Sequence, residues 1–364
     1  MGPTSVTLQV VTVVCALAAV AGAALAWERR GSRWTWPTRI AALTLCPLTA
    51  LAAAAVAVNR EVDSYSTWAD VLGTRHATPA APAVHVDVPA PDNGGAGAAG
   101  GQVGQVVQIT VSGRRSGVTL PAYVYLPVAY ESADGRGTRF PVIEALAGFP
   151  GSPQTWLNGI GAVRILDAEI ADGRMAPTVA VFPVQDPAPN RDSECVDAVG
   201  GAKFDTYLGL DLPDAVKAQF RVRTDRAGWG LVGYSTGGFC AANLALRHPD
   251  RFAATASLSG YFTPITDATT GDLYRGDIKA RDENNPIWRL RKLPVPRLSV
   301  YLAAARDDRQ AMTNLRWFVQ AAKPPLRVAT GLVPQGGHTK AVWSALGPAV
   351  FDWLSGQLAA PDPA

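Results

Sequence analysis

The chain has 364 residues, of which 48% are hydrophobic and 17% are charged. This length allows about two domains of ~150 residues, and the apolar content excludes a disordered polymer. Lysine and arginine number 33 against 30 acidic residues, a net charge of +3. Because no basic cluster is interleaved with aromatic residues, we expect no nucleic-acid partner. The four cysteines form no C-x-x-C pair and no cluster with histidine, so we expect no metal.

Two long apolar segments open the chain. Residues 6–27 and residues 40–58 contain no charged side chain, and each is about the ~20 residues that a helix needs to cross a hydrocarbon core. We therefore expect a transmembrane hairpin over residues 1–60. The alternatives are a cleaved signal peptide for the first segment and a buried core helix for the second. The absence of positive charge before Val6 argues against a signal peptide.

The distribution of arginine predicts how the hairpin is oriented. Residues 28–39, between the two segments, carry four arginines, whereas residues 59–63 carry one arginine and two acids. Arginine-rich loops stay on the cytoplasmic side of a membrane. We therefore expect a cell-membrane protein in which everything after residue 60 is extracytoplasmic.

Residues 61–104 are predicted to separate the membrane from a folded domain. Residues 61–76 are compatible with a short amphipathic segment at the membrane surface. Residues 77–101 are rich in proline and alanine and then in glycine and alanine. Such a composition cannot bury enough apolar surface to fold, so we expect a linker. The folded domain is expected at residues 105–358.

That domain alternates strand-like and helix-like segments. Two segments with alternating apolar residues flank the turn at residues 113–117, which predicts an antiparallel hairpin. Short apolar runs and helical segments then alternate, which predicts an α/β fold with a mostly parallel sheet and flanking helices. The predicted strands are residues 103–111, 118–126, 140–147, 178–184, 228–233, 255–258, 298–305 and 327–333, and the predicted helices are residues 212–220, 237–247, 309–322 and 339–358.

A G-x-S-x-G pattern stands where one predicted strand meets a helix. Its sequence is G-Y-S-T-G, with Ser235 at the centre. A serine on such a sharp turn needs glycines two residues away on both sides, because side chains there would collide. This context predicts that Ser235 is a nucleophile.

The histidines point to one base for that serine. Of the four in the chain, His76 and His85 lie in the juxtamembrane segment and the linker. His248 ends the helix after Ser235 and is expected to point away from it. His338 lies in a glycine-containing loop after the last predicted strand. It is therefore the predicted base, with an ordinary surface histidine as the alternative.

An acid must orient the imidazole of that base. The predicted strand at residues 298–305 is followed by Asp307 and Asp308, which gives the order Ser, Asp, His expected of this architecture. We favour Asp308, since the extra residue carries its side chain beyond the sheet edge. Asp307 remains the alternative acid, and we otherwise expect it to cap the helix that begins near Arg309.

The oxyanion of the reaction needs backbone donors. One is expected to be the N–H of Thr236, directly after the serine. The other is expected from the loop after the strand at residues 140–147. Pro150 has no N–H, so Phe149 is the predicted donor.

Four motifs together resemble one known family. They are G-Y-S-T-G-G, A-G-F-P-G at residues 147–151, K-F-D-T-Y-L-G-L-D-L-P at residues 203–213 and G-G-H-T-K-A-V-W at residues 336–343. Over roughly residues 105–358 the chain resembles the esterase D-like esterases, the α/β-hydrolase branch that includes the mycolyltransferases. The resemblance implies serine acyl chemistry without a cofactor. It also implies that the family's nucleophile, acid, base and two oxyanion amides correspond to Ser235, Asp308, His338, Phe149 and Thr236.

The chain departs from the mycolyltransferases at two places. Those enzymes carry a glutamate as the acid and a sugar-binding arginine just after the oxyanion loop, where this sequence has P-G-S at residues 150–152. The resemblance therefore does not imply a trehalose acceptor. Many esterase relatives begin the oxyanion loop with His-Gly, where Ala147 stands here, but a backbone amide donates in either case.

Two further expectations concern the surroundings of the site. Cys195 and Cys240 both fall near the active edge of the sheet, and we expect a disulfide in an oxidising compartment, with two free thiols as the alternative. The insertion at residues 261–296 lies where substrate loops of such folds occur. With Phe149, the residues Trp156, Tyr261 and Trp288 are therefore candidates to line an acyl pocket, and core packing is the alternative.

These features predict a membrane-anchored extracytoplasmic serine esterase or acyltransferase that acts on envelope or lipid-like esters. The alternative is a non-catalytic binding or scaffold protein on a hydrolase fold. A complete Ser, Asp and His set favours the enzyme, because a site without catalytic activity would not need a strained turn. The sequence leaves open the acyl chain, the acceptor and the oligomeric state.

Overall fold

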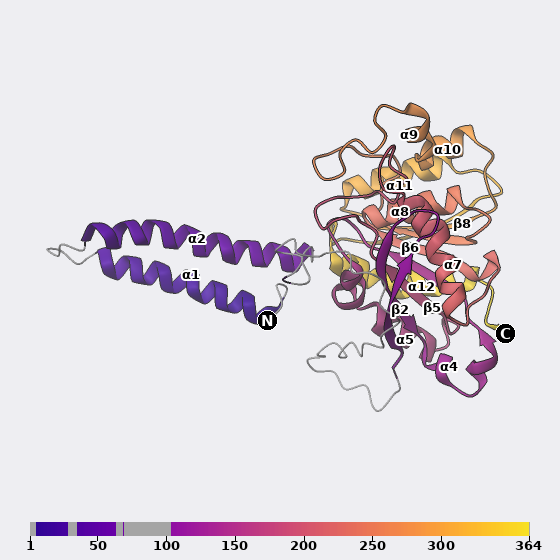
Figure 1. The fold of residues 1–364 in the computed structure, drawn as a ribbon, viewed down its shortest axis with the longest axis horizontal. Coiled ribbons are helices and arrows are strands. Elements are labelled where there is room, and N and C mark those ends of the chain that lie inside the picture. Colours follow the sequence, from indigo (N-terminus) through magenta and orange to yellow (C-terminus); the bar gives the residue numbers. More distant parts are fainter. Residues whose placement is uncertain (1–4, 28–34, 63–67, 69–102, 364) are drawn as a thin grey trace. The chain divides into compact units, whose positions relative to one another are not determined.

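The computed structural model describes residues 5–27, 35–62, 68 and 103–363 (Figure 1). It divides into two compact units, residues 1–76 and residues 77–364. The predictions for the arginine-rich loop at residues 28–34, for most of residues 63–76 and for the linker at residues 77–101 lie outside the described residues. So do His76 and His85.

The first unit is a helical hairpin. Helix α1 (Val6–Trp27) packs against α2 (Thr35–Val62), which extends beyond both ends of the predicted segment and contains Pro47. Both helices contain stretches apolar and long enough to cross a membrane, Val6–Leu25 with a mean hydropathy of 2.3 and Trp36–Asn59 with 2.1. By length and composition, both are candidate membrane spans.

The second unit is built on an eight-stranded sheet in the order β1-β2-β5-β4-β6-β7-β8-β9. The first two strands form the predicted hairpin, β2 pairs antiparallel with β5, and the remaining pairs are parallel. The mostly parallel sheet is confirmed. Its strands are β1 (Gln105–Ser112), β2 (Thr119–Leu126), β4 (Val142–Leu146), β5 (Val179–Pro183), β6 (Trp229–Tyr234), β7 (Ala254–Leu258), β8 (Ser299–Ala305) and β9 (Arg327–Val333); β3 (Thr138–Arg139) pairs separately with β10 (Asp362–Pro363).

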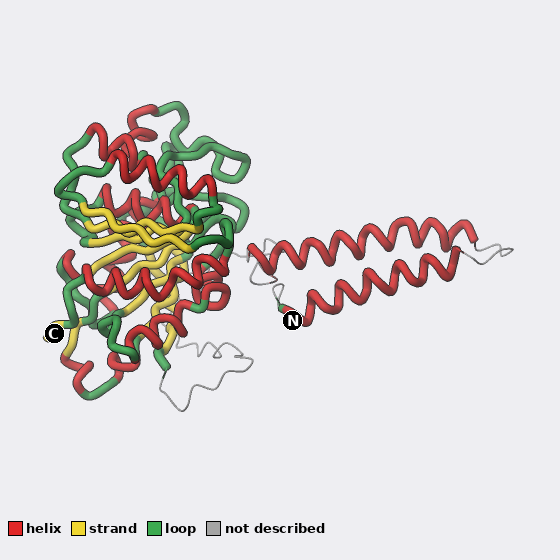
Figure 2. Tube along the Cα trace, turned by 180° about the vertical axis from the view of Figure 1, so that it is seen from behind, coloured by secondary structure: helices red, strands yellow, loops and turns green. Residues whose placement is uncertain are grey.

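Helices cover both faces of the sheet, as Figure 2 shows for the strands in yellow. Alternate residues of β4 enter two core clusters, Val142 and Leu146 in one and Ile143 and Ala145 in the other, as side chains on opposite faces must. Helices α5 (Ala162–Ala171) and α12 (Lys340–Gln357) contribute to the second cluster. The first cluster includes residues of α7 (Leu212–Gln219), α8 (Thr236–Arg247), α10 (Pro286–Lys292) and α11 (Arg309–Ala321).

Short helices complete the unit. Two of them, α9 (Ile278–Glu283) and α10, lie in the insertion at residues 261–296, which was expected only as a substrate loop. Asp277 and Asn285 cap them with their side chains. The other short elements are α4 (Val128–Glu131), η1 (Asp134–Gly137), η2 (Thr155–Ile160), α6 (Phe204–Thr206), η3 (Tyr207–Asp211) and η4 (Arg226–Gly228).

The parallel strands bring the predicted site residues to one edge. Strands β4, β6, β8 and β9 run in the same direction, so their carboxyl ends meet at one edge of the sheet. The loop at residues 147–151 follows β4, Ser235 follows β6, the two aspartates follow β8, and the loop of His338 follows β9.

One carboxylic acid lies in the middle of the core. Glu144 of β4 pairs with Val181 of β5 on one side and with Leu231 of β6 on the other, and its side chain is fully buried. Neither carboxyl oxygen has a hydrogen-bond partner among the described residues. Burial without a partner disfavours the charged form, and it raises the pKa of Glu144 well above its usual range.

We expect the Glu144→Gln variant to be more stable than the wild type at about pH 8, with an advantage that shrinks toward pH 5. Because burial raises the pKa of the Glu144 carboxyl, the folded wild type keeps its proton to a higher pH than the unfolded chain, whose carboxyl has a pKa of 4.5. Its free energy of unfolding therefore falls by about 1.4 kcal/mol per pH unit between the unfolded and folded pKa values. Urea unfolding of both full-length proteins across this pH range measures the difference. A difference that does not change with pH would contradict the assignment.

Candidate active site

Ser235 stands in a strained backbone conformation between β6 and α8. Its φ of 53° and ψ of −122° lie outside the regions that side chains ordinarily adopt. A Cβ on Gly233 would collide with the carbonyl of Gly237, and one on Gly237 would collide with the carbonyls of Leu146 and Ala147. The glycines of the G-x-S-x-G pattern are therefore required by the close approach of backbone to backbone.

Ser235, His338 and Asp308 form one chain of hydrogen bonds. Nε2 of His338 lies 2.9 Å from Oγ of Ser235, and Nδ1 lies 2.7 Å from Oδ2 of Asp308. With the ring proton on Nδ1, the serine hydroxyl donates to Nε2 and Nδ1–H donates to the carboxylate. The Asp308 side chain is 5% exposed and that of His338 is 45% exposed. The carboxylate is therefore buried, whereas the imidazole that it bonds is partly open to solvent.

The two neighbouring aspartates have different partners. Oδ1 of Asp308 accepts from the N–H of Ala311 at 3.0 Å and so caps α11. The expectation that Asp307 caps this helix is wrong, because Asp308 occupies the position before its first residue. Asp307 instead accepts from the N–H groups of Gly336 at 3.0 Å and Gly337 at 2.9 Å, and these bonds lower its pKa.

The loop that carries His338 is shaped by two glycines and an indole. Gly336 and Gly337 have φ values of 130° and 62°, which side chains other than glycine rarely adopt. The ring of Trp343 meets the imidazole edge to face, at 5.2 Å and 88°. Trp343 in turn stacks on Tyr234 at 4.3 Å. These contacts limit how far the imidazole can turn.

The predicted oxyanion loop lies directly beside Ser235. A Cβ on Gly148 would stand 2.9 Å from the Cβ of Ser235, and Phe149 is the next residue. Thr236 is the first residue of α8, so its N–H precedes the hydrogen bonds of the helix. Both predicted donors thus belong to segments that border Ser235.

A buried acidic cluster borders the site and was not predicted. Oδ2 of Asp192 accepts from the Thr236 hydroxyl at 3.3 Å, and Oε1 of Glu194 accepts from the Tyr261 hydroxyl at 2.8 Å. Burial raises the pKa of Asp192 to about 6 and that of Glu194 to about 8. The sequence signal for this cluster is the pair of acids in the D-S-E-C motif at residues 192–195, in which only the cysteine has a predicted role.

Cys195 and Cys240 are joined by a disulfide across 45 residues. Cys240 lies on α8, five residues after Ser235, and both cysteines are fully buried. The bond therefore joins the loop of the acidic cluster to α8, the helix that begins directly after Ser235.

The candidate pocket residues occupy different surroundings. Trp156 is 1% exposed and packs against Tyr234 and Phe351, so it is part of the core. Tyr261 is half-buried and stacks on Phe239 at 4.9 Å. Trp288 is half-buried on α10, a helix that packs against α8, α9 and α11. The structure does not bring these three aromatic rings together in one wall.

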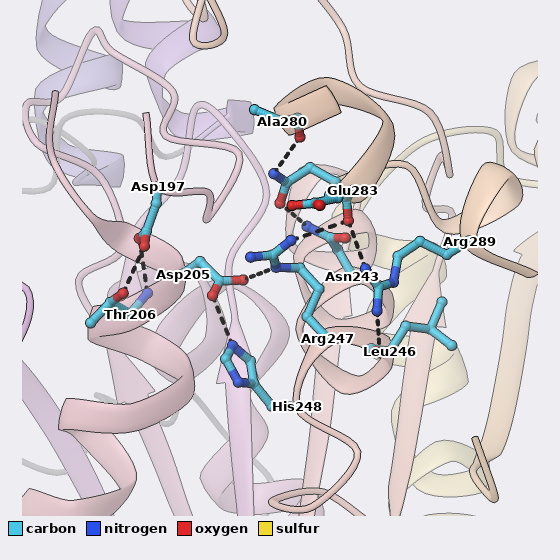
Figure 3. Close-up of polar contacts among 11 residues, drawn as sticks. Asp197, Asp205, Thr206, Asn243, Leu246, Arg247, His248, Ala280, Glu283 and Arg289 are labelled. Atoms are coloured by element: carbon cyan, nitrogen blue, oxygen red, sulfur yellow. Dashed lines mark hydrogen bonds and ion pairs between the residues drawn. The ribbon is translucent and has the colours of Figure 1, made fainter. Parts of the chain in front are cut away.

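His248 belongs to a separate polar network, drawn in Figure 3. Its Nε2 lies 2.8 Å from Oδ1 of Asp205, whose Oδ2 accepts from Nε of Arg247 at 2.6 Å. Arg247 and Arg289 both donate to the carbonyl of Glu283, at 3.2 Å and 3.1 Å. This network joins the end of α8 to the α9 and α10 region and contains no contact to Ser235. Among the described residues, no group of three or more histidine, cysteine or acidic side chains could hold a metal ion.

Comparison with known proteins identifies the family. Residues 115–350 match the family model described as "Putative esterase", and the chain belongs to this esterase family. An uncharacterised protein of Corynebacterium glutamicum is 27% identical over 273 residues, which cover 70% of this chain and 62% of that protein. The MPT51/MPB51 antigen of Mycobacterium tuberculosis is 36% identical over 77 residues, 21% of this chain and 25% of the antigen. The chain thus spans less than two thirds of the length of these relatives.

Solved structures agree on the fold. A ferulic acid esterase superimposes with a TM-score of 0.60 at 20% identity, covering 71% of this chain and 99% of that chain. An S-formylglutathione hydrolase from Agrobacterium tumefaciens does so with a TM-score of 0.59 at 16% identity, covering 70% and 96%. The predicted α/β-hydrolase fold is therefore confirmed.

The two aspartates give different expectations for ester turnover. Asp308→Asn should lower kcat by on the order of 10⁴, because an amide at this position favours the wrong imidazole tautomer. Asp307→Asn keeps one acceptor oxygen for the loop, so its kcat should fall by no more than about tenfold, the value of one ordinary hydrogen bond. Steady-state kinetics of both full-length variants on p-nitrophenyl butyrate measures the two losses. Equal losses, or a larger loss in Asp307→Asn, would overturn this division of roles.

Proposed function

We propose that this chain is a membrane-anchored serine esterase or acyltransferase that works through an acyl intermediate on Ser235. The observation that carries the proposal is the continuous hydrogen-bond chain from Ser235 through His338 to Asp308, with distances of 2.9 Å and 2.7 Å. It borders a loop and a helix start that offer backbone N–H groups.

This geometry supports the first half of the reaction, in which Ser235 is acylated. Oγ of Ser235 attacks the ester carbonyl carbon while its proton passes to Nε2 of His338, and Asp308 stabilises the imidazolium. The N–H groups of Phe149 and Thr236 stabilise the oxyanion. When the carbon–oxygen bond to the alcohol breaks, His338 returns the proton to the leaving alcohol. The acyl group remains on Ser235.

The deacylation half uses the same groups in reverse. A water or an alcohol gives its proton to His338 and attacks the acyl carbon, and the proton then returns to Ser235. Water releases a carboxylic acid, whereas an alcohol releases a new ester. Both outcomes fit one acyl-serine intermediate, so the reaction class is acyl transfer from an ester to an oxygen acceptor.

Three features support a catalytic unit outside the cytoplasm that acts on lipid-like envelope esters. The apolar helices α1 and α2 are candidate anchors, and the loop between them is rich in arginine. The disulfide between Cys195 and Cys240 fits an oxidising compartment. A site tethered at a membrane meets amphiphilic esters at high local concentration.

The nucleophile is tested by covalent labelling. A fluorophosphonate probe should label the full-length wild type and a Ser132→Ala control, but not Ser235→Ala, which lacks the attacking oxygen. Turnover of p-nitrophenyl butyrate should be lost in parallel, to the residual rate that backbone amides and binding supply. Peptide mapping locates the label. Full labelling or full turnover in Ser235→Ala would refute the proposed function.

The topology is tested by protease accessibility. Protease added to intact spheroplasts of expressing cells should release the catalytic unit by cutting in residues 77–101, because that segment is expected outside the cytoplasm. A cytoplasmic marker enzyme serves as the control for intact membranes. A catalytic unit that is protected until the membrane is broken would place it on the cytoplasmic side.

A further inference from the structure

One buried glutamine holds the start of the oxyanion loop. Gln185 lies two residues after the end of β5 and is 3% exposed. Its Nε2 donates to the carbonyl of Ala147 at 2.8 Å, and its Oε1 accepts from the N–H of Ala147 at 2.8 Å. A single side chain thus satisfies both backbone groups of one residue.

Ala147 has no strand partner that could do the same. The ladder between β4 and β5 stops at Glu144, and the ladder between β4 and β6 stops at Leu146. Ala147 is 2% exposed, so water does not replace the missing strand. The neutral amide of a glutamine side chain can donate a hydrogen bond from its NH₂ group and accept one at its carbonyl oxygen. At Ala147 the side chain of Gln185 therefore makes the two hydrogen bonds that a neighbouring strand would otherwise make.

Ala147 is in contact with the turn that carries the nucleophile. A Cβ on Gly237 would collide with the carbonyl of Ala147, and a Cβ on Gly148 would stand 2.9 Å from the Cβ of Ser235. Phe149, the proposed oxyanion donor, is two residues beyond Ala147. Any rotation of the Ala147 peptide groups would therefore move the Phe149 N–H relative to Ser235.

The backbone of Gln185 is itself fixed from the opposite side. The carbonyl oxygen of Gln185 accepts from the hydroxyl of Ser193 at 2.6 Å. The hydroxyl oxygen of Ser193 in turn accepts from the N–H of Cys195 at 2.9 Å. Cys195 is bonded to Cys240 on α8. Gln185 is thus tied to the helix of the nucleophile by a covalent and hydrogen-bonded path, in addition to its contact with the oxyanion loop.

We propose that Gln185 is a positioning residue that fixes the Phe149 N–H at the oxyanion position through its two hydrogen bonds to Ala147. The proposal rests on the proposed function, since it assigns a role in stabilising the oxyanion that Ser235 chemistry creates. Gln185 does not touch the substrate. It acts by preorganising a backbone donor, which is effective only when the donor already points at the developing charge.

Gln185→Met separates this role from simple stability. Methionine keeps the length but loses both hydrogen bonds, so kcat on p-nitrophenyl butyrate should fall by about 100-fold, the cost of a misplaced reacting geometry. KM should change by less than about threefold, because the ground-state carbonyl uses the donor weakly. A trifluoromethyl ketone, whose serine adduct carries an oxyanion, should bind more weakly by the same factor as the fall in kcat.

Two further variants make the test specific. Gln185→Glu keeps both bonds while its carboxyl is protonated, so its kcat should approach that of the wild type at about pH 6 and exceed that of Gln185→Met. Asn243→Leu serves as the control for losing a buried amide, because Asn243 is fully buried on α8 and donates to Asn284 at 3.0 Å. It should lower Tm without changing kcat or the affinity for the ketone.

Each outcome decides a separate claim. Near-normal kcat and ketone affinity in Gln185→Met, or a loss of Tm alone as in Asn243→Leu, would overturn the positioning role while leaving the proposed function intact. If Gln185→Met fails to fold, Gln185→Glu provides the test. A folded Gln185→Glu variant whose kcat is reduced by the same factor, relative to the wild type, from pH 6 to pH 9 would also overturn the positioning role. A wild-type protein without ester turnover or labelling of Ser235 would overturn both claims.

Discussion

The strained turn at Ser235 is the constraint around which the rest of the site is arranged. A non-glycine residue with a φ of 53° costs of order 1–3 kcal/mol and persists only where its surroundings enforce it. Here the enforcement is close backbone packing: Gly237 lies against the carbonyls of Leu146 and Ala147, and Gly238 lies against Gly260. Side chains at these glycines would push the start of α8 away from the backbone at the ends of β4 and β7, so the turn depends on how closely the helix approaches the sheet.

Because the turn stands at the carboxyl edge of parallel strands, groups distant in the chain reach it from neighbouring strand ends. The loop of Phe149, the proposed oxyanion donor, follows β4, Gln185 follows β5, Asp308 follows β8, and the loop of His338 follows β9. The surrounding contacts then restrict the orientation of the reacting groups: Asp308 and Trp343 act on the imidazole, and Gln185 acts on the backbone of Ala147. Preorganisation of this kind lowers the reorganisation needed during the reaction.

The sequence predicted those parts of the site that depend on local pattern. The strands, the turn at Ser235 and the chain order of Ser235, Asp308 and His338 follow from short segments with clear apolar runs. The roles of Asp307 and Asp308 were harder to predict from sequence. The two residues are adjacent, and a shift of one residue in the start of α11 would change which of them caps the helix. Gln185 was missed because its partner lies 38 residues away and no local pattern encodes that contact. Trp156 was considered for the pocket, but residue type alone does not distinguish a pocket wall from the core that it occupies.

The most direct test is to observe the acyl group on the enzyme. Full-length protein mixed with p-nitrophenyl butyrate and quenched in acid during turnover is analysed by intact mass and peptide mapping. We expect one butyryl adduct on the peptide that contains Ser235, formed and consumed at rates consistent with kcat. An adduct on a different residue, or unchanged turnover in Ser235→Ala, would contradict this role of Ser235.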